Sequence, residues 1–156
     1  VQTQVWPIET RNTWLKRRKQ TQDIVLLDVP CSGSGVWRRN PDAKWVLTQE
    51  RLDELCEIQQ SILQQASALV AKGGRLVYAT CSVFEEENEA QIERFLSENK
   101  GFKIIPVAEV WAEALKAETV HGRCPVSGPM MRLAPHTTKT DGFFLTVLER
   151  TEDESN

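Results

Sequence analysis

Several classes of protein are excluded by what this sequence lacks. No apolar run approaches the ~20 residues that cross a bilayer, and Val1–Gln4 are neither the charged region nor the start of the apolar region of a secretory signal. Basic residues are not in excess, because 19 Lys and Arg against 22 Asp and Glu give a net charge of −3. That balance excludes a uniformly basic nucleic-acid wrapper but permits a local basic patch. With 156 residues, 40% of them apolar, we expect one globular core and no membrane association.

Cysteine is sparse and has no metal-binding spacing. The chain holds four, Cys31, Cys56, Cys81 and Cys124, and no two of them form a CxxC pair. A structural zinc site is therefore not expected. Four cysteines are also few for a disulfide scaffold of this length. We expect reduced thiols in a cytoplasmic protein.

The common phosphate-binding loops are missing as well. Residues 33–38 begin like the dinucleotide fingerprint GxGxxG, but Arg38 stands at its third glycine. No GxxxxGK[ST] loop occurs anywhere. A thiol phosphatase needs a cysteine and an arginine that cradle a phosphate, and the six residues between Cys31 and Arg38 are one more than such a cradle typically holds. A thiol-dependent hydrolase thus remains an alternative that the spacing disfavours.

One strand-helix-strand unit dominates the first half of the chain. The unbroken apolar run at 23–29 predicts a strand buried on both faces. Apolar residues at helical spacing over 48–70 predict a helix with Thr48 as N-cap and Gly73 as its stop. A second buried strand is expected at 74–80, so the unit is a right-handed βαβ.

Weaker patterns follow. Ser82 and Glu85 have capping-box spacing and predict a helix that stops by Gly101. Further expectations are strands at 102–105 and 142–148, a possible strand at 1–6, a loop over 107–141 with one short helix at 111–115, and a frayed acidic tail at 151–156. The basic cluster Lys16–Lys19 is either a solvated face or a phosphate contact.

Polar residues follow both strands of the βαβ unit. Ligands of open α/β sheets bind beyond the carboxyl ends of the strands, so Cys31 and Cys81 are expected to face one crevice with Asp28. Exposed backbone N–H groups there favour the thiolate at both cysteines. Asp28 is either a catalytic acid or a turn cap. Cys56 lies on the apolar helix face and reads as a small hydrophobe, and nothing around Cys124 marks it as functional.

Three blocks of sequence carry a family resemblance. DVPCSGSG at 28–35 with RRNPDAKW at 38–45 resembles the fourth motif of the Sun/Fmu (NOL/NOP/Sun) RNA cytosine-C5 methyltransferases, although Val29 replaces the usual alanine. KGGRLVYATCS at 72–82 with ENE at 87–89 is similar to their sixth motif, and RLAPH at 132–136 with DGFF at 141–144 resembles their C-terminal end. Order and spacing agree over roughly residues 23–150.

The resemblance implies methyl transfer from S-adenosyl-L-methionine to carbon 5 of a cytosine in RNA. Ribosomal RNA is the first candidate substrate and transfer RNA the second. Cys81 would be the thiol that attacks carbon 6, and Cys31 the second thiol, which assists release. Asp28 would hydrogen-bond the N3 edge of the base, helped by burial that keeps it protonated. DNA cytosine methyltransferases instead use a Pro-Cys thiol, which would point to Cys31, so the residues alone leave the choice open.

Further residues follow from the same resemblance. Asp28 and Pro30 would contact the cofactor. Contacts to the RNA would come from Ser32, Gly33, Arg38, Arg39 and Lys44, for which the alternative is plain loop solvation and packing. A non-catalytic RNA-binding or assembly module derived from the family is the rival function.

The implied fold is a Rossmann-like α/β methyltransferase fold, of which residues 1–150 would be only the C-terminal half of the sheet. The family's glycine-rich first motif is not found in the sequence. In the family's strand order, 3-2-1-4-5-7-6, the strand at 23–29 would lie beside strand 1. We therefore expect weak cofactor binding by this chain, and self-association through an unpaired sheet edge.

Overall fold

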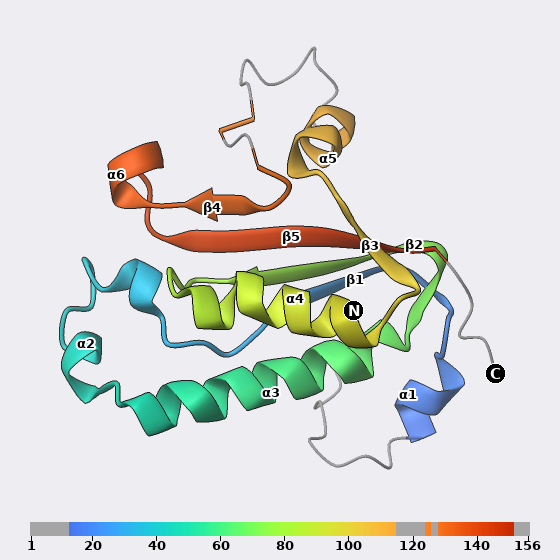
Figure 1. Ribbon diagram of the computed structural model, residues 1–156, viewed down its shortest axis with the longest axis horizontal. Helices are drawn as coiled ribbons and strands as arrows, with labels where there is room; N and C mark the ends of the chain where they lie inside the picture. The colour runs from blue at the N-terminus through green and yellow to red at the C-terminus, as the bar shows by residue number, and fades with distance from the viewer. Residues whose placement is uncertain (1–12, 115–123, 126–127, 152–156) are drawn as a thin grey trace.

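A five-stranded sheet with helices on both sides forms the protein (Figure 1). The computed structural model describes residues 13–114, 124–125 and 128–151. The strands are β1 (Gln22–Asp28), β2 (Val70–Thr80), β3 (Phe102–Ile105), β4 (Met131–Leu133) and β5 (Phe143–Arg150). The helices are α1 (Thr13–Arg17), α2 (Ala43–Val46), α3 (Gln49–Ser67), α4 (Glu89–Glu98), α5 (Val107–Ala114) and α6 (Pro135–Thr138). Two 3-10 turns are η1 (Ser34–Val36) and η2 (Glu85–Glu87).

The strand order agrees with the order that the resemblance implies. The sheet runs β1-β2-β5-β3, with β4 also on β5. β1 and β2 are parallel, whereas β5 is antiparallel to β2, β3 and β4. These strands take the places of 4, 5, 7 and 6 in the expected series. The α/β, Rossmann-like fold class and the βαβ unit β1-α3-β2 are confirmed.

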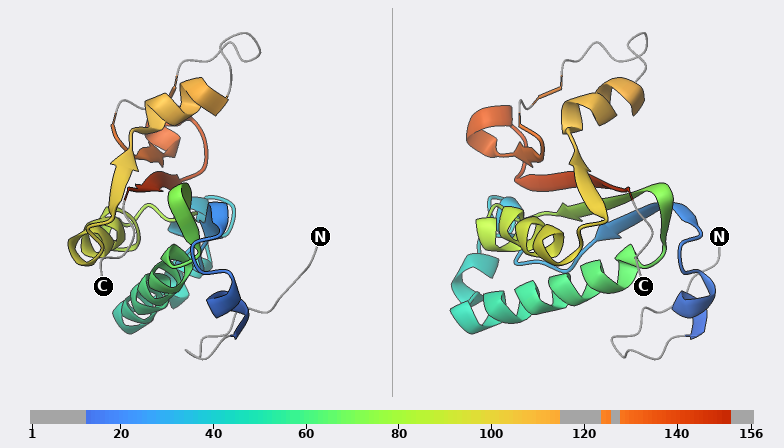
Figure 2. Two further views of the ribbon diagram at one scale, coloured as in Figure 1. Left: turned by 90° about the vertical axis from the view of Figure 1, so that its right-hand side faces the viewer. Right: turned by 45° about the vertical axis from the view of Figure 1, so that its right-hand side comes forward.

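The core lies between the sheet and the two longest helices. α3 packs on β1 and β2, and α4 lies beside α3, as the two views of Figure 2 also show. Side chains at 0% exposure from helix and sheet meet there, among them Leu63, Tyr78, Phe95 and Phe144. Tyr78 and Phe144 stack edge to face across β2 and β5. This packing holds the carboxyl ends of β1 and β2 in a fixed relation.

The long helix ends earlier than its apolar spacing predicts. Thr48 caps it as expected, accepting a hydrogen bond from Arg51 N at 3.2 Å. The helix stops at Ser67, however, and β2 begins at Val70, because Thr21 and Gln22 donate to the Leu69 carbonyl. Gly73, with φ of 75°, is therefore a bulge in β2 rather than the helix stop. Buried residues at a helix end and at a strand start look alike in sequence.

The second half contains more structure than its sequence suggests. Ser82 and Glu85 form no capping box, because Ser82 is buried and donates to Glu87, so α4 starts only at Glu89. β4 and α6 lie where a loop was expected, and β4 forms by pairing with the long β5. The strand at 102–105 and the last strand are confirmed, and the short helix is present but begins at Val107, earlier than expected. The possible strand at 1–6 and the tail at 152–156 lie outside the described residues. None of the described helices has the length and apolar character of a membrane span.

β1 presents an open flank. Among the described strands it pairs with β2 alone, and Ile24 and Leu26, which share one face, are each 66% exposed. Free strand edges with apolar side chains pair readily with other chains.

We expect the chain to self-associate through this flank. Sedimentation velocity over a range of concentrations should show dimers or larger species. Ile24→Lys with Leu26→Lys should shift the chain to monomer, since charge on an edge opposes pairing. Val46→Lys, at another exposed apolar residue (75%), is the matched control. A wild-type monomer at all concentrations would contradict the prediction.

Candidate active site

Two thiols meet where β1 and β2 end. Because the strands are parallel neighbours, their carboxyl ends lie at one edge, with Cys31 after β1 and Cys81 directly after β2. The two Sγ atoms are 3.4 Å apart and hydrogen-bonded, and both cysteines are half-buried free thiols. The expected juxtaposition is thus present.

The Cys31 thiol is held in its protonated form. Burial raises the pKa of Cys31 to about 12, and the neighbouring Cys81 sulfur adds to the rise. The hydrogen bond from the Gly33 backbone lowers this pKa but is outweighed. At neutral pH Cys31 therefore keeps its proton, and either sulfur can be the donor of the hydrogen bond between the two thiols. The expectation of a favoured thiolate at both cysteines is wrong for Cys31, because desolvation outweighs the backbone donors.

The loop after Cys31 is locked against the turn after β2. Gly35 N donates to Cys81 O at 2.9 Å, and Gly142 N donates to Gly35 O at 2.8 Å. A Cβ on Gly35 would lie 2.2 Å from Gly142 O and 2.8 Å from Cys81 O. The glycine at 35 is thus required by a close approach of three backbone segments.

A buried carboxyl group joins the two thiol loops. Glu87 is 0% exposed. It accepts hydrogen bonds from Ser32 N (2.8 Å), Ser32 Oγ (2.5 Å), Ser82 Oγ (2.5 Å) and Gln59 Nε2 (3.0 Å). Sequence reasoning gave Glu87 no role, because a run of three glutamates before a helix reads as a solvated surface. The only signal was its place in the ENE block.

Asp28 and Pro30 are both exposed at the end of β1. The Pro30 carbonyl accepts from Gln59 Nε2 at 2.9 Å, which ties this loop to α3. The expected burial of Asp28 is not observed, because the residue ends the strand at the open flank of the sheet. It remains beside the thiol loop as an accessible carboxylate.

The basic residues of the loop are already paired. Arg39 Nε and Arg38 Nη2 donate to Asp141, at 2.7 and 3.3 Å, and both arginines are exposed. The hydrogen bond from Arg39 is the main cause that lowers the pKa of Asp141. Lys44 lies over the ring of Trp45, with Nζ 5.7 Å from its centroid. Arg38, which the hydrolase alternative needs at the thiol, is thus held by Asp141.

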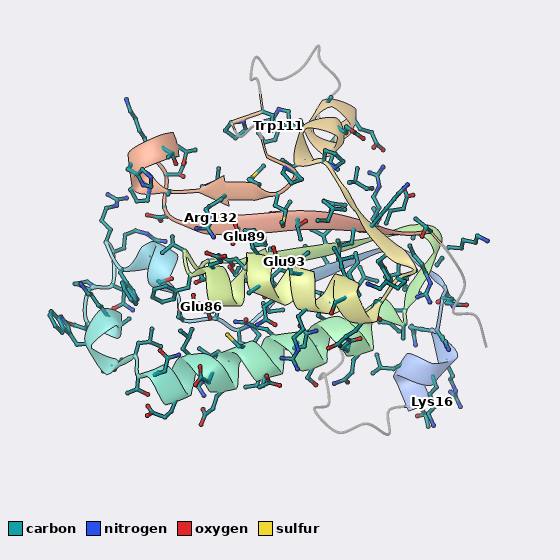
Figure 3. All side chains as sticks on the ribbon, in the orientation of Figure 1. Lys16, Glu86, Glu89, Glu93, Trp111 and Arg132 are labelled. Atoms are coloured by element: carbon teal, nitrogen blue, oxygen red, sulfur yellow. The ribbon has the colours of Figure 1, made fainter. Side chains whose placement is uncertain are left out.

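A second ion pair supports the turn after Cys81 from the side of β4. Arg132 donates to both carboxylate oxygens of Glu89 at the start of α4, and to Val83 O at 3.5 Å (Figure 3). Residues from the third resembling block therefore support the second one.

A cleft of about 450 Å³ opens beside Cys31. Its walls are mostly apolar, and they come from Cys31, Ser32, Ala43, Val46, Leu47, Arg51 and Leu55. Its size falls in the range of ligand pockets. Cys31 and Ser32 are among its lining residues, and Gly33, with φ of 67°, makes the left-handed turn that follows them.

The other two cysteines lie apart from this pair. Cys56 is half-buried on α3 and its thiol donates to Glu86 O at 3.4 Å. Burial, with the nearby Glu87 charge, raises its pKa. Cys124 is half-buried as well.

Known proteins are similar to this chain in sequence and in fold. The profile of the family described as 16S rRNA methyltransferase RsmB/F matches residues 1–149. The probable ribosomal RNA small subunit methyltransferase B of Synechocystis is 35% identical over 147 residues, 94% of this chain and 31% of that protein. The protein PH0851 superposes with a TM-score of 0.69 and 39% identity, over 85% of this chain and 27% of the other. NSun6 from Pyrococcus horikoshii, solved with SFG, has a TM-score of 0.62 and 27% identity, over 82% and 30%.

The profile match, residues 1–149, includes the two thiol loops and nearly all of the sheet that positions them. The chain spans about a third or less of the length of these relatives. Sequence profile, relatives and fold agree with the three resembling blocks. The chain belongs to the RsmB/F family of 16S rRNA methyltransferases.

Proposed function

We propose that this chain is part of the catalytic domain of an S-adenosylmethionine-dependent methyltransferase that modifies carbon 5 of a cytosine in small-subunit ribosomal RNA. The observation that carries the proposal is the pair of thiols 3.4 Å apart, at the ends of adjacent parallel strands. The family relation supports ribosomal RNA as the substrate. NSun6, solved with SFG, an analogue of S-adenosylmethionine, supports the choice of methyl donor.

The pair of thiols suits covalent catalysis. Carbon 5 of cytosine is a poor nucleophile. When the Cys81 thiolate adds to carbon 6, a carbon–sulfur bond forms, aromaticity is lost and carbon 5 becomes enamine-like. Carbon 5 then takes the electrophilic methyl group that the donor supplies. Loss of the carbon 5 proton to a base restores the double bond and expels the Cys81 sulfur.

Cys31 is placed to assist that last step. Its pKa of about 12 keeps it protonated, and its sulfur lies 3.4 Å from the sulfur that must leave. Donation to the departing Cys81 thiolate stabilises the charge that develops there. The proposal is therefore that Cys81 attacks and Cys31 assists release.

The groups beside the thiols are suited to contact the methyl donor and the RNA. Asp28 and Pro30 lie at the carboxyl end of β1, where such sheets bind ligands. The exposed Asp28 carboxyl group suits the positively charged groups of the methyl donor when ionised, and it can donate to N3 of cytosine only in its protonated form. On the loop and helix that follow, where the target base would arrive unstacked, Ser32 and Gly33 are half-buried, whereas Arg38, Arg39 and Lys44 are exposed. Phosphates could exchange with Asp141 at the two arginines.

The test is the identity of the modified nucleoside. A full-length family member that carries these 156 residues is incubated with S-adenosylmethionine bearing a labelled methyl group and with unmodified small-subunit rRNA. We expect 5-methylcytidine in the nucleoside digest, and none with transfer RNA. RNA binding without methyl transfer would favour the non-catalytic module. A label on another nucleoside would contradict the proposed chemistry.

A further inference from the structure

The strongest feature outside the thiols themselves is the hydrogen-bond network of Glu87. Each carboxylate oxygen accepts two donors: Oε1 from Ser32 N and Gln59 Nε2, and Oε2 from the hydroxyls of Ser32 and Ser82. A carboxylate has acceptor sites for all four. Hydrogen bonds to a buried charged group are among the stronger ones in proteins.

These donors come from the residues next to the two thiols. Ser32 directly follows Cys31, and Ser82 directly follows Cys81. Ser34 Oγ and Ser82 Oγ are 2.9 Å apart, and Ser34 Oγ accepts from Val83 N, so a chain of hydroxyls connects both loops to the carboxylate. One side chain thus ties the loop after β1 to the turn after β2.

Glu87 is itself held firmly. The Tyr78 hydroxyl donates to Glu87 O at 2.7 Å, and Tyr78 is 0% exposed in the core. The neighbouring Asn88 side chain bonds Thr80 Oγ1 at 2.6 Å and Ser82 O at 3.0 Å. The carboxylate therefore sits on a frame that is fixed to β2.

We propose that Glu87 is a positioning residue, which sets the separation of the Cys31 and Cys81 sulfurs by accepting hydrogen bonds from Ser32 and Ser82. The inference rests on the proposed function for its purpose, because attack and release by different thiols need both sulfurs at one carbon–sulfur bond. Its geometry stands independently of that function. Glu87 need not touch RNA or methyl donor.

A chemical measurement of thiol separation tests this without RNA or methyl donor. The reduced chain is equilibrated with oxidised glutathione. One cysteine displaces reduced glutathione to form a mixed disulfide, and the other then displaces the second glutathione, closing a Cys31–Cys81 disulfide. Peptide mass spectrometry quantifies that bond. Its equilibrium constant, in units of concentration, reports the effective concentration of one thiol at the other.

We expect Glu87→Ala to lower this effective concentration about tenfold or more, since its loss leaves four donors unpaired and frees the loops. Glu87→Gln should restore most of it. Its Oε1 can accept from Ser32 N and Gln59, while its amide donates to the two serine hydroxyls, which can also accept. Glu85→Ala, at an exposed carboxylate on the same turn, should match wild type.

Circular dichroism selects a temperature at which the variants are folded. If Glu87→Ala does not fold, Ser82→Ala provides the test. It removes the hydrogen bond from the Cys81 turn to Glu87 and should also lower the effective concentration. A folded Glu87→Ala or Ser82→Ala with the wild-type value would overturn the proposal. So would a Glu87→Gln value as low as that of Glu87→Ala. If methyl transfer is not observed but the disulfide measurements come out as expected, Glu87 still positions the two thiols, and the thiol pair serves another chemistry.

Discussion

Replacing Cys81 by alanine in a full-length family member that carries this sequence is expected to abolish methylation and to leave no covalent protein–RNA complex. Replacing Cys31 by alanine is expected to make the covalent protein–RNA complex accumulate. Attack by Cys81 needs no second thiol, so the adduct still forms and takes the methyl group. Its release then lacks the thiol whose sulfur lies 3.4 Å from the leaving sulfur. The Cys31 variant should therefore accumulate an adduct that survives denaturing gels.

The reverse pattern would assign attack to the loop that follows β1. An adduct from Cys81→Ala with none from Cys31→Ala would also contradict the proton assignment, since the raised pKa of Cys31 disfavours it as a nucleophile at neutral pH. Cys56→Ala is the matched control. Its half-buried thiol lies on α3, so the loss should cost about 1 kcal/mol or less and leave the adduct pattern unchanged.

Gly35→Ala is expected to lower the free energy of unfolding by about 3 kcal/mol or more, among the largest effects of a single methyl group. The new Cβ would lie 2.2 Å from Gly142 O and 2.8 Å from Cys81 O. Both neighbours are backbone atoms, so neither can rotate away. The loop must shift and lose the bonds of Gly35 to Cys81 and Gly142. Urea denaturation followed by fluorescence measures the change.

Gly33→Ala is the matched control two residues away. Gly33 has φ of 67°, but nothing crowds it more closely than 3.8 Å, from Val36 Cγ2. Alanine there should cost only the left-handed backbone penalty of about 1–2 kcal/mol. Equal costs at both positions would mean that the contact between the Cys31 loop and Gly142 is looser than the structure indicates.

Several features of the fold were predictable because they depend on neighbours in sequence. The runs at 23–29 and within 70–80 are apolar without alternation and predicted two strands, but the expected cover on both faces is wrong for β1, where Ile24 and Leu26 are each 66% exposed at the edge of the sheet. Thr48 caps α3 because its side chain reaches an amide three residues on. The three resembling blocks carried the family and the strand order. Parallel pairing of β1 and β2 then brought Cys31 and Cys81 together.

Other features depend on residues far apart in the chain. β4 has only three residues and no pattern of its own, and it exists because β5 offers an edge. Arg38 and Arg39, read as phosphate contacts, meet Asp141 about a hundred residues later. Ser82 and Glu85 match a local capping rule, yet Ser82 is turned inward by Glu87. Local rules fail where a buried polar group finds a better partner across the fold.

The sequence by itself determined the fold class, the family and the two thiols, since these follow from short-range patterns and from motifs that are read in order. Only the tertiary structure decided which groups surround those thiols. Glu87 became a buried acceptor between Ser32 and Ser82, and burial raised the pKa of the Cys31 thiol. Burial and pairing set both outcomes, and they arise only when segments some fifty residues apart pack together.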